Sequence, residues 1–91
     1  MVKHISIRVS GKVQGVYYRK SAQHEAQKLG IAGFVRNEAG GDVWIEAQGE
    51  ESLIDAFIKW CGKGPENARV DNLAIEEHPV SQSYATFEIR H

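Results

Sequence analysis

The segment Lys3-His4-Ile5-Ser6-Ile7-Arg8-Val9-Ser10-Gly11-Lys12-Val13-Gln14-Gly15-Val16-Tyr17-Tyr18-Arg19 determines the plan of the fold. Apolar and polar side chains alternate over residues 3–10, which is typical of a half-buried β-strand. A loop with glycines follows at residues 11–17, and a helix is expected to begin at Tyr18. The alternation places one set of strand residues inward, Ile5, Ile7 and Val9, and the other set outward, His4, Ser6 and Arg8.

Two helices are expected from apolar residues that recur at helical spacing. In the first helix these residues are followed by Gly30, which supplies a C-terminal stop. The second helix begins in an acidic stretch, residues 50–55, as the helix dipole favours, and it ends at Gly62. The first apolar stripe is Tyr18, Ala22, Ala26 and Leu29, and the second is Leu53, Ala56, Phe57, Trp60 and Cys61.

The further strands complete the order of elements. They are expected over residues 32–36, over residues 43–49, around Leu73 and Ile75 with an end at Pro79, and over residues 85–89, with a hairpin connection at residues 37–42. The order strand, helix, strand, strand, helix, strand, with an extra short strand at the end, predicts a ferredoxin-like α+β sandwich. Because each helix has only one apolar stripe, both are expected to pack on one face of a mostly antiparallel sheet.

Composition limits the classes of function. The 91 residues are expected to form one domain over residues 1–91. The net charge of -1 gives no global basic field, so nucleic acid is not an expected partner. No apolar run approaches the ~20 residues that span a bilayer, and the N-terminus has no signal-peptide core. We therefore expect a cytoplasmic protein without a membrane partner.

Cysteine and histidine usage gives no sign of a disulfide or a metal site. The single cysteine, Cys61, excludes an internal disulfide and is expected to fill the core. The histidines have no ligand spacing between them, so we expect surface residues and no metal or other cofactor. The histidines are His4, His24, His78 and His91.

The loop and the first helical turn together could hold an anion. The first N–H groups of a helix lack internal partners, and the helix dipole places partial positive charge there. Arg19 opposes that dipole at a cost of about 0.3–1 kcal/mol, and a phosphate between the helix start and the guanidinium would resolve the misfit. The plainer alternative is a turn glycine and an ordinary surface arginine. A nucleotide-binding P-loop is excluded, because its glycine-lysine-serine/threonine ending is missing.

Several motifs of the chain resemble the acylphosphatase family. Residues 11–19 resemble its signature, glycine-x-valine-glutamine-glycine-valine-x-x-arginine, and residues 33–37 resemble its second block. Further similarities cover nearly all of the chain, at Leu29-Gly30, Gly41-x-Val43, Gln48-Gly49, Gly64-Pro65, Ala68-Arg69-Val70 and Phe87-Glu88-Ile89-Arg90.

The resemblance implies a metal-independent hydrolase that cleaves the carboxyl–phosphate bond of small acyl phosphates. It assigns substrate binding to Arg19, orientation of the attacking water to Asn37, and no cofactor. It also implies that inorganic phosphate, the product, inhibits competitively, and that the protein is a monomer. Which acyl phosphate is physiological stays open. The implied phosphate cradle is the backbone of Gln14, Gly15, Val16, Tyr17 and Tyr18, completed by Arg19.

Four positions depart from the family pattern. Tyr17-Tyr18 stands where many members have two phenylalanines or glycine-phenylalanine, and a buried tyrosine hydroxyl would need a polar partner. Glu38 replaces a common threonine, and its carboxylate could repel an anionic substrate. Gly40 replaces a common turn aspartate.

Two other functions remain alternatives. An RNA-recognition module of the same plan would carry aromatic residues on its central strands, and residues 3–10 carry none. A catalytically inactive relative would still bind phosphate and serve as a binding or regulatory module. Hydrolysis of benzoyl phosphate in the presence of a chelator distinguishes these alternatives.

Overall fold

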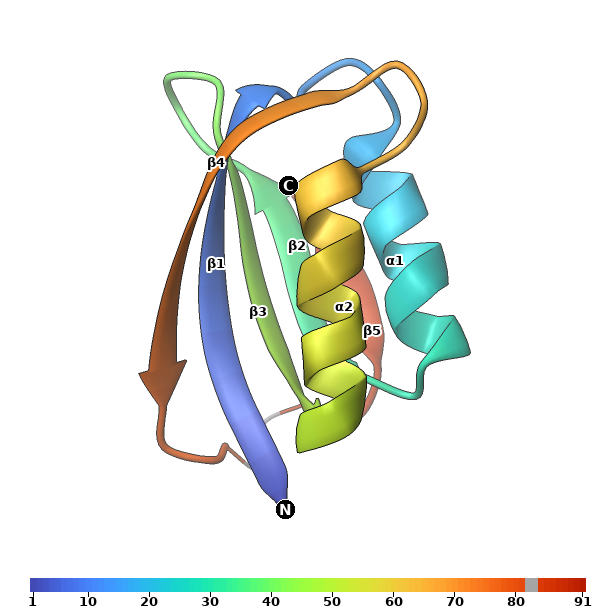
Figure 1. Ribbon diagram of the computed structural model, residues 1–91, viewed down its shortest axis with the longest axis vertical. Coiled ribbons are helices and arrows are strands. Elements are labelled where there is room, and N and C mark those ends of the chain that lie inside the picture. Colours follow the sequence, from blue (N-terminus) through green and yellow to red (C-terminus); the bar gives the residue numbers. More distant parts are fainter. Residues whose placement is uncertain (82–83) are drawn as a thin grey trace.

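An open β-sheet with two helices on one face forms the framework of the protein (Figure 1). The structure is a computed structural model that describes residues 1–81 and 84–91. In chain order the elements are β1 (Val2–Lys12), α1 (Tyr18–Lys28), β2 (Ala32–Asn37), β3 (Val43–Glu50), α2 (Glu51–Lys63), β4 (Arg69–His78) and β5 (Phe87–Arg90).

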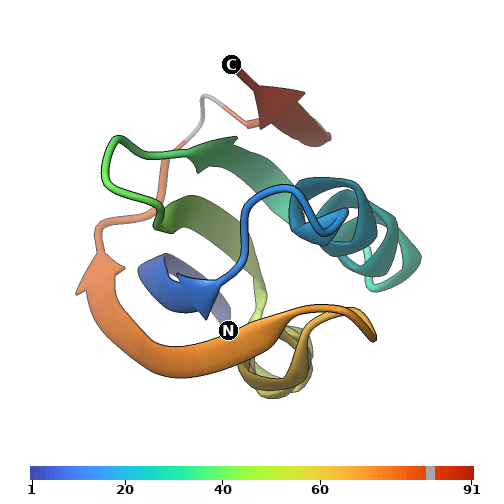
Figure 2. The ribbon, with the colours of Figure 1, turned by 90° about the horizontal axis from the view of Figure 1, so that it is seen from above.

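The strand order across the sheet is β4-β1-β3-β2-β5. β1 pairs antiparallel with β3 and β4, and β2 pairs antiparallel with β3. Only β5 runs parallel to its neighbour, β2, among the described residues. Figures 1 and 2 place α1 and α2 on the same face of the sheet. The expected ferredoxin-like sandwich with an added short strand is therefore confirmed.

The first strand is longer than the alternation predicts. It continues through Gly11 and Lys12, which pair with β4 beyond a bulge at Ser10. Gly11 has φ 133°, and a Cβ at this position would lie 2.1 Å from the carbonyl oxygen of Arg69. Only glycine allows β4 to approach so closely, and the connection to α1 therefore begins at Val13 and not at residue 11.

The second helix buries a different stripe from the expected one. Ile54, Phe57 and Cys61 are buried, whereas Leu53 is 37% exposed and Ala56 is exposed. Both sets fit helical spacing, so the sequence pattern alone cannot tell which set faces the sheet. The helix also ends at Lys63 and not at Gly62, because its C-terminal cap is Gly64 with φ 69°.

The helix-free face of the sheet is more covered than expected. His4 and Ser6 are only 6% and 1% exposed, so the expectation that both face solvent was wrong. The Nδ1 atom of His4 lies 2.8 Å from the carbonyl oxygen of Pro79, and its Nε2 atom lies 2.9 Å from a carboxylate oxygen of Glu46. Pro79 and Tyr84, in the connection from β4 to β5, bring this cover.

In residues 1–81 and 84–91, no helix combines the length and the apolar character that crossing a membrane requires.

Candidate functional site

A loop at the end of β1 leads directly into the first turn of α1. Gly15 and Tyr17 both have left-handed backbone conformations, with φ 74° and φ 63°. In the described part of the chain, the N–H groups of residues 14–17 have no protein acceptor. Ser21 makes the first helical bond, 3.0 Å to the carbonyl oxygen of Tyr17, so the N–H groups before it have no partner within the helix. A run of free backbone donors therefore lies at the positive end of α1.

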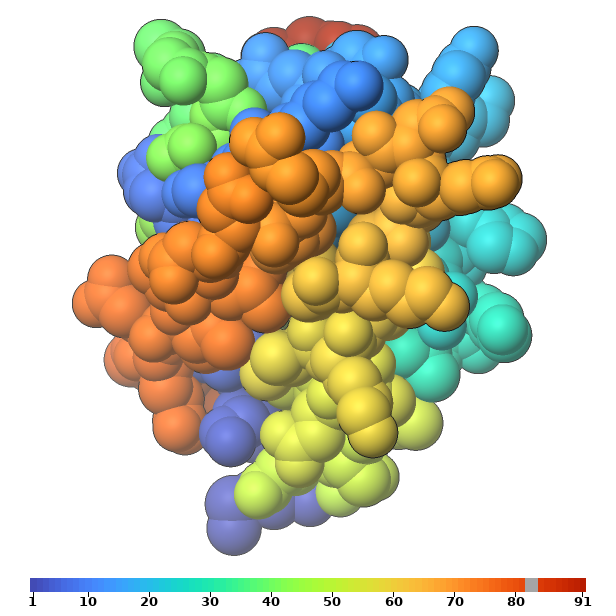
Figure 3. Space-filling view, turned by 45° about the horizontal axis from the view of Figure 1, so that its top comes forward, coloured from blue at the N-terminus to red at the C-terminus, as the bar shows by residue number. Residues whose placement is uncertain are grey.

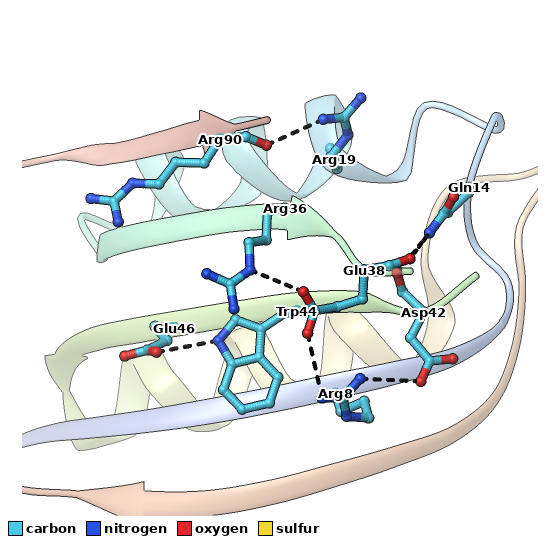
Figure 4. A network of polar contacts seen from close by, with 9 residues as sticks. All are labelled: Arg8, Gln14, Arg19, Arg36, Glu38, Asp42, Trp44, Glu46 and Arg90. Carbon is cyan, nitrogen blue, oxygen red and sulfur yellow. Dashed lines mark hydrogen bonds and ion pairs between the residues drawn. The ribbon is translucent and has the colours of Figure 1, made fainter. Parts of the chain in front are cut away.

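Arg19 holds its guanidinium group beside this loop. Its Nη1 atom donates to the carbonyl oxygen of Arg90 at 3.3 Å (Figure 4) and lies 3.3 Å from Nδ1 of His91. Neither contact is an ion pair, and no carboxylate of the described residues pairs with Arg19. The first turn of α1 holds no acidic residue either. The positive charge is thus available to an anionic ligand.

An open pocket of about 460 Å³ collects most of the predicted site residues. Five of them line it together: Gly15, Tyr17, Tyr18, Arg19 and Asn37. The other lining residues are Val13, Lys20, Ile89 and His91. Because Arg19 and Lys20 line this pocket, and no aspartate or glutamate of the described residues does, it favours an anion.

Two predicted loop residues have side chains outside the pocket lining. The side chain of Val16 is buried in the core. The amide of Gln14 donates to the carbonyl oxygens of Glu38 and Asp42, at 2.8 and 2.9 Å. Gln14 therefore ties the loop to the β2–β3 connection, which begins directly after Asn37. This bridge connects the loop to the segment that follows Asn37.

The carboxylate of Glu38 is neutralised by neighbouring arginines (Figure 4). Arg36 Nε donates to one of its oxygens at 3.1 Å, and Arg8 Nη2 donates to the other at 3.4 Å. Arg8 also reaches Asp42 at 3.4 Å, and its guanidinium lies 5.2 Å from the centroid of the Trp44 ring. Glu38 does not line the pocket. We therefore expect its carboxylate, which is paired with two arginines, to repel an anion in the pocket only weakly.

The buried tyrosine has the polar partner that the sequence required. Tyr18 is 1% exposed, and its hydroxyl donates to the carbonyl oxygen of Cys61 at 2.7 Å. Burial raises the pKa of the Tyr18 hydroxyl far above its usual value. Burial also raises the pKa of the Cys61 thiol to about 12. Both groups therefore stay protonated at neutral pH and act as structural residues of the core.

Sequence reasoning missed the C-terminus as part of the site. Ile89 and His91 line the pocket because β5 runs parallel to β2 and ends beside α1. His91 was expected to be an ordinary surface residue, and no motif or spacing marks it. The described residues hold no group of three or more His, Cys, Asp or Glu side chains arranged for a metal ion.

Comparison with known proteins gives a consistent result. The sequence profile of the acylphosphatase family matches residues 5–89. An acylphosphatase of Marinobacter nauticus is 48% identical over 83 residues, which cover 91% of this chain and 90% of that protein. An acylphosphatase of Rubrobacter xylanophilus is 41% identical over 97% of this chain and 80% of its own length.

A solved structure has the same fold over its whole length. The crystal structure of an acylphosphatase from Bacillus subtilis has a TM-score of 0.94, is 32% identical, and matches over 100% of both chains. The signature loop, the matched profile and the shared fold agree, and this chain belongs to the acylphosphatase family.

Proposed function

We propose that this protein hydrolyses small acyl phosphates to a carboxylate and inorganic phosphate in the pocket at the start of α1. The backbone N–H groups of residues 14–18 and the Arg19 guanidinium hold the phosphoryl oxygens. Asn37 orients the attacking water. The observation that supports this proposal most is that free loop amides, an arginine without an ion pair and Asn37 border one pocket.

The chemistry asks mainly for positioning and for stabilisation of charge. A carboxylate is a good leaving group, so the phosphoryl group needs to be held in line with the water while charge spreads over its oxygens. Donors that are already oriented stabilise this charge without reorganising. Arg19 suits the task because its planar fork can donate two parallel hydrogen bonds to one phosphoryl group.

Asn37 can orient a water but cannot remove its proton, because an amide has no basic group. The proton of the water passes to a phosphoryl oxygen of the substrate in this proposal. His91 lines the pocket, yet its Nδ1 atom lies against the donor of Arg19. We therefore expect a flat dependence of rate on pH near neutrality, unchanged in His91→Ala. A bell-shaped dependence that disappears in His91→Ala would make His91 the base and refute this step.

Hydrolysis of benzoyl phosphate with a chelator present tests the activity itself. We expect turnover that inorganic phosphate inhibits competitively. Binding of phosphate without turnover would favour the alternative, an inactive phosphate-binding or regulatory module. Absence of both binding and turnover would refute the proposal.

Variants separate the two assigned roles. Arg19→Ala should abolish phosphate binding and turnover, and Arg19→Lys should restore little, since an ammonium group cannot form the two parallel bonds. Asn37→Ala should keep phosphate binding while kcat falls ~100-fold or more, as when an oriented donor is removed. Near-normal turnover in Asn37→Ala would contradict its role.

The proposal also covers the oligomeric state, location and partners of the enzyme. It acts as a monomeric single domain in the cytoplasm, with an acyl phosphate as its small-molecule partner and with no cofactor. Sedimentation of the purified chain tests the monomer, and a stable dimer would contradict it.

A further inference from the structure

A second pocket lies directly beside the phosphate pocket. It has a volume of about 460 Å³ and lies between α1 and the end of α2. Ser21 and His24 line it from α1, whereas Trp60 and Pro65 line it from α2 and the connection that follows. Figure 3 shows that connection, in yellow and orange, next to the light-blue start of α1. We refer to this pocket as the side groove.

The side groove and the phosphate pocket share two residues, Tyr17 and Lys20. Tyr17 belongs to the loop whose backbone we assign to the phosphoryl group, so its side chain stands at the border between the two spaces. An acyl phosphate has its phosphoryl group at one end and its acyl group at the other. When the loop holds the phosphoryl end, the acyl end can extend past Tyr17 into the side groove.

Tyr17 adopts a conformation that is costly for an aromatic residue. Its φ of 63° is the single positive value among the described residues other than glycine. A non-glycine residue in this region costs on the order of 1 kcal/mol, and glycine would adopt it without strain. Tyr17 is 78% exposed and makes no side-chain capping bond to α1. Burial or capping therefore does not explain why a large ring stands here.

Trp60 offers a fixed flat surface within the same groove. Its ring stacks on Phe57, with centroids 6.2 Å apart and an interplanar angle of 9°, and lies 5.5 Å from the ring of Tyr18. Both of these neighbours are buried, so the indole is held in place before a ligand arrives. A rigid aromatic surface binds flat apolar groups at little entropic cost.

We infer that the side groove binds the acyl group of the substrate, and that Tyr17 and Trp60 make the enzyme selective for acyl phosphates with a planar aromatic acyl group. This inference rests on the proposed function, because it needs the phosphoryl group in the neighbouring loop. An acetyl group carries only a methyl group beyond its carbonyl, whereas a benzoyl group presents a flat ring to the aromatic side chains that line the groove.

The selectivity is measured as the ratio of kcat/KM for benzoyl phosphate to kcat/KM for acetyl phosphate. Comparing this ratio between variants removes the intrinsic reactivity of each substrate. Tyr17→Gly should lower the ratio roughly 3- to 10-fold, the range expected for one lost aromatic contact. Tyr17→Phe retains the ring and should preserve the ratio. Because glycine relieves the strain, Tyr17→Gly should unfold at the same or a higher urea concentration.

The outcomes separate the groove from the proposed function. If the wild-type enzyme hydrolyses neither substrate, the proposed function fails. If it hydrolyses both and Tyr17→Gly changes the ratio less than twofold, the side groove does not bind the acyl group. An equal loss for both substrates would assign Tyr17 to the loop alone and also overturn the inference. A Tyr17→Gly variant that is less stable than the wild type would show that the ring contributes to packing, and this result would also overturn the inference.

A second variant tests the groove without changing the loop. Ser21→Phe fills the groove from α1 and should lower the ratio in the same direction. Lys28→Phe is the matched control, since this exposed residue lies on the same helix outside both pockets. Equal ratios in Ser21→Phe and Lys28→Phe would refute the inference even if Tyr17→Gly failed to fold.

Discussion

Replacing Gln14 by methionine removes the hydrogen-bonded bridge between the loop and the β2–β3 connection. Methionine has a similar length and no donor, so the substitution deletes two bonds while keeping most of the volume. The bonds of 2.8 and 2.9 Å end on the carbonyl oxygens of Glu38 and Asp42. The change therefore tests whether this bridge positions Asn37, the residue just before the connection.

The magnitude follows from what happens to the two carbonyl groups. A typical hydrogen bond contributes about 0.5–1.5 kcal/mol, so two give about 1–3 kcal/mol. The carbonyl oxygen of Glu38 still accepts from Gly41 N at 3.3 Å, and that of Asp42 still accepts from Glu38 N at 2.8 Å. Because neither acceptor is left unpaired, we expect the lower part of this range, about 1–2 kcal/mol of unfolding free energy.

The effect on catalysis should exceed the effect on phosphate binding. Phosphate binding depends on the loop and Arg19, whereas turnover also needs Asn37 at a fixed distance from the loop. A displacement of about 1 Å can cost on the order of 100-fold in rate. We expect kcat to fall between ~10- and 100-fold, with a smaller change in the inhibition constant of inorganic phosphate.

Urea unfolding and steady-state hydrolysis of benzoyl phosphate measure both effects. Gln27→Met is the matched control, because Gln27 makes one bond of 3.3 Å to the carbonyl oxygen of Phe87, and neither residue lines the pocket. The control should lose less than about 0.5 kcal/mol and keep its activity. If Gln14→Met keeps the stability and the kcat of the wild type, the bridge does not position Asn37.

Three further outcomes are expected. Gly33→Ala should lower the free energy of unfolding, measured by urea titration, by more than about 4 kcal/mol, because its Cβ would lie 1.9 Å from the carbonyl oxygen of Glu46. Gly40→Ala, whose Cβ would meet no atom within 4 Å, should lower it by at most about 3 kcal/mol. Equal losses in the two variants would contradict this packing. Glu38→Gln should change KM less than about threefold, because arginines already neutralise this carboxylate; a large fall in KM would mean that it repels the substrate. Burial alone would raise the pKa of Glu46, but hydrogen bonds from Tyr84 and two other side chains lower it overall. A carboxyl group whose pKa is lowered by folding stabilises the folded state at pH values above its ordinary pKa. This stabilisation is lost as the pH falls through the pKa of the folded state. Glu46→Gln should therefore lower the unfolding free energy by about 1–2 kcal/mol near pH 7 and by less near pH 3; the same loss at both pH values would refute the linkage.

The sequence predicted the fold because its information is local. Alternation over residues 3–10, helical spacing after Tyr18 and the glycines at the turns each specify one element, and their order specifies the plan. Alternation also tells which residues share a face, but it cannot tell whether that face is covered. His4 and Ser6 were misplaced for this reason, since their cover comes from the distant connection after β4.

The candidate site was predictable only where a contiguous motif carries it. Residues 11–19 contain the loop and Arg19, and Asn37 lies in the second block, so the resemblance could name them. The amide of Gln14 and the ring of His91 act through residues that are distant in the sequence, at separations of 24, 28 and 72 positions. Such contacts arise because the β2–β3 connection meets the loop and the end of β5 meets the first turn of α1, which no spacing in the sequence encodes.

A crystal structure grown with inorganic phosphate tests the phosphate cradle most directly. We expect one phosphate ion in the pocket, within hydrogen-bonding distance of the backbone N–H groups of residues 14–18. The Arg19 guanidinium should turn from the carbonyl oxygen of Arg90 onto two oxygens of this phosphate. A pocket that stays empty at saturating phosphate, with Arg19 still held by Arg90 and His91, would contradict the account.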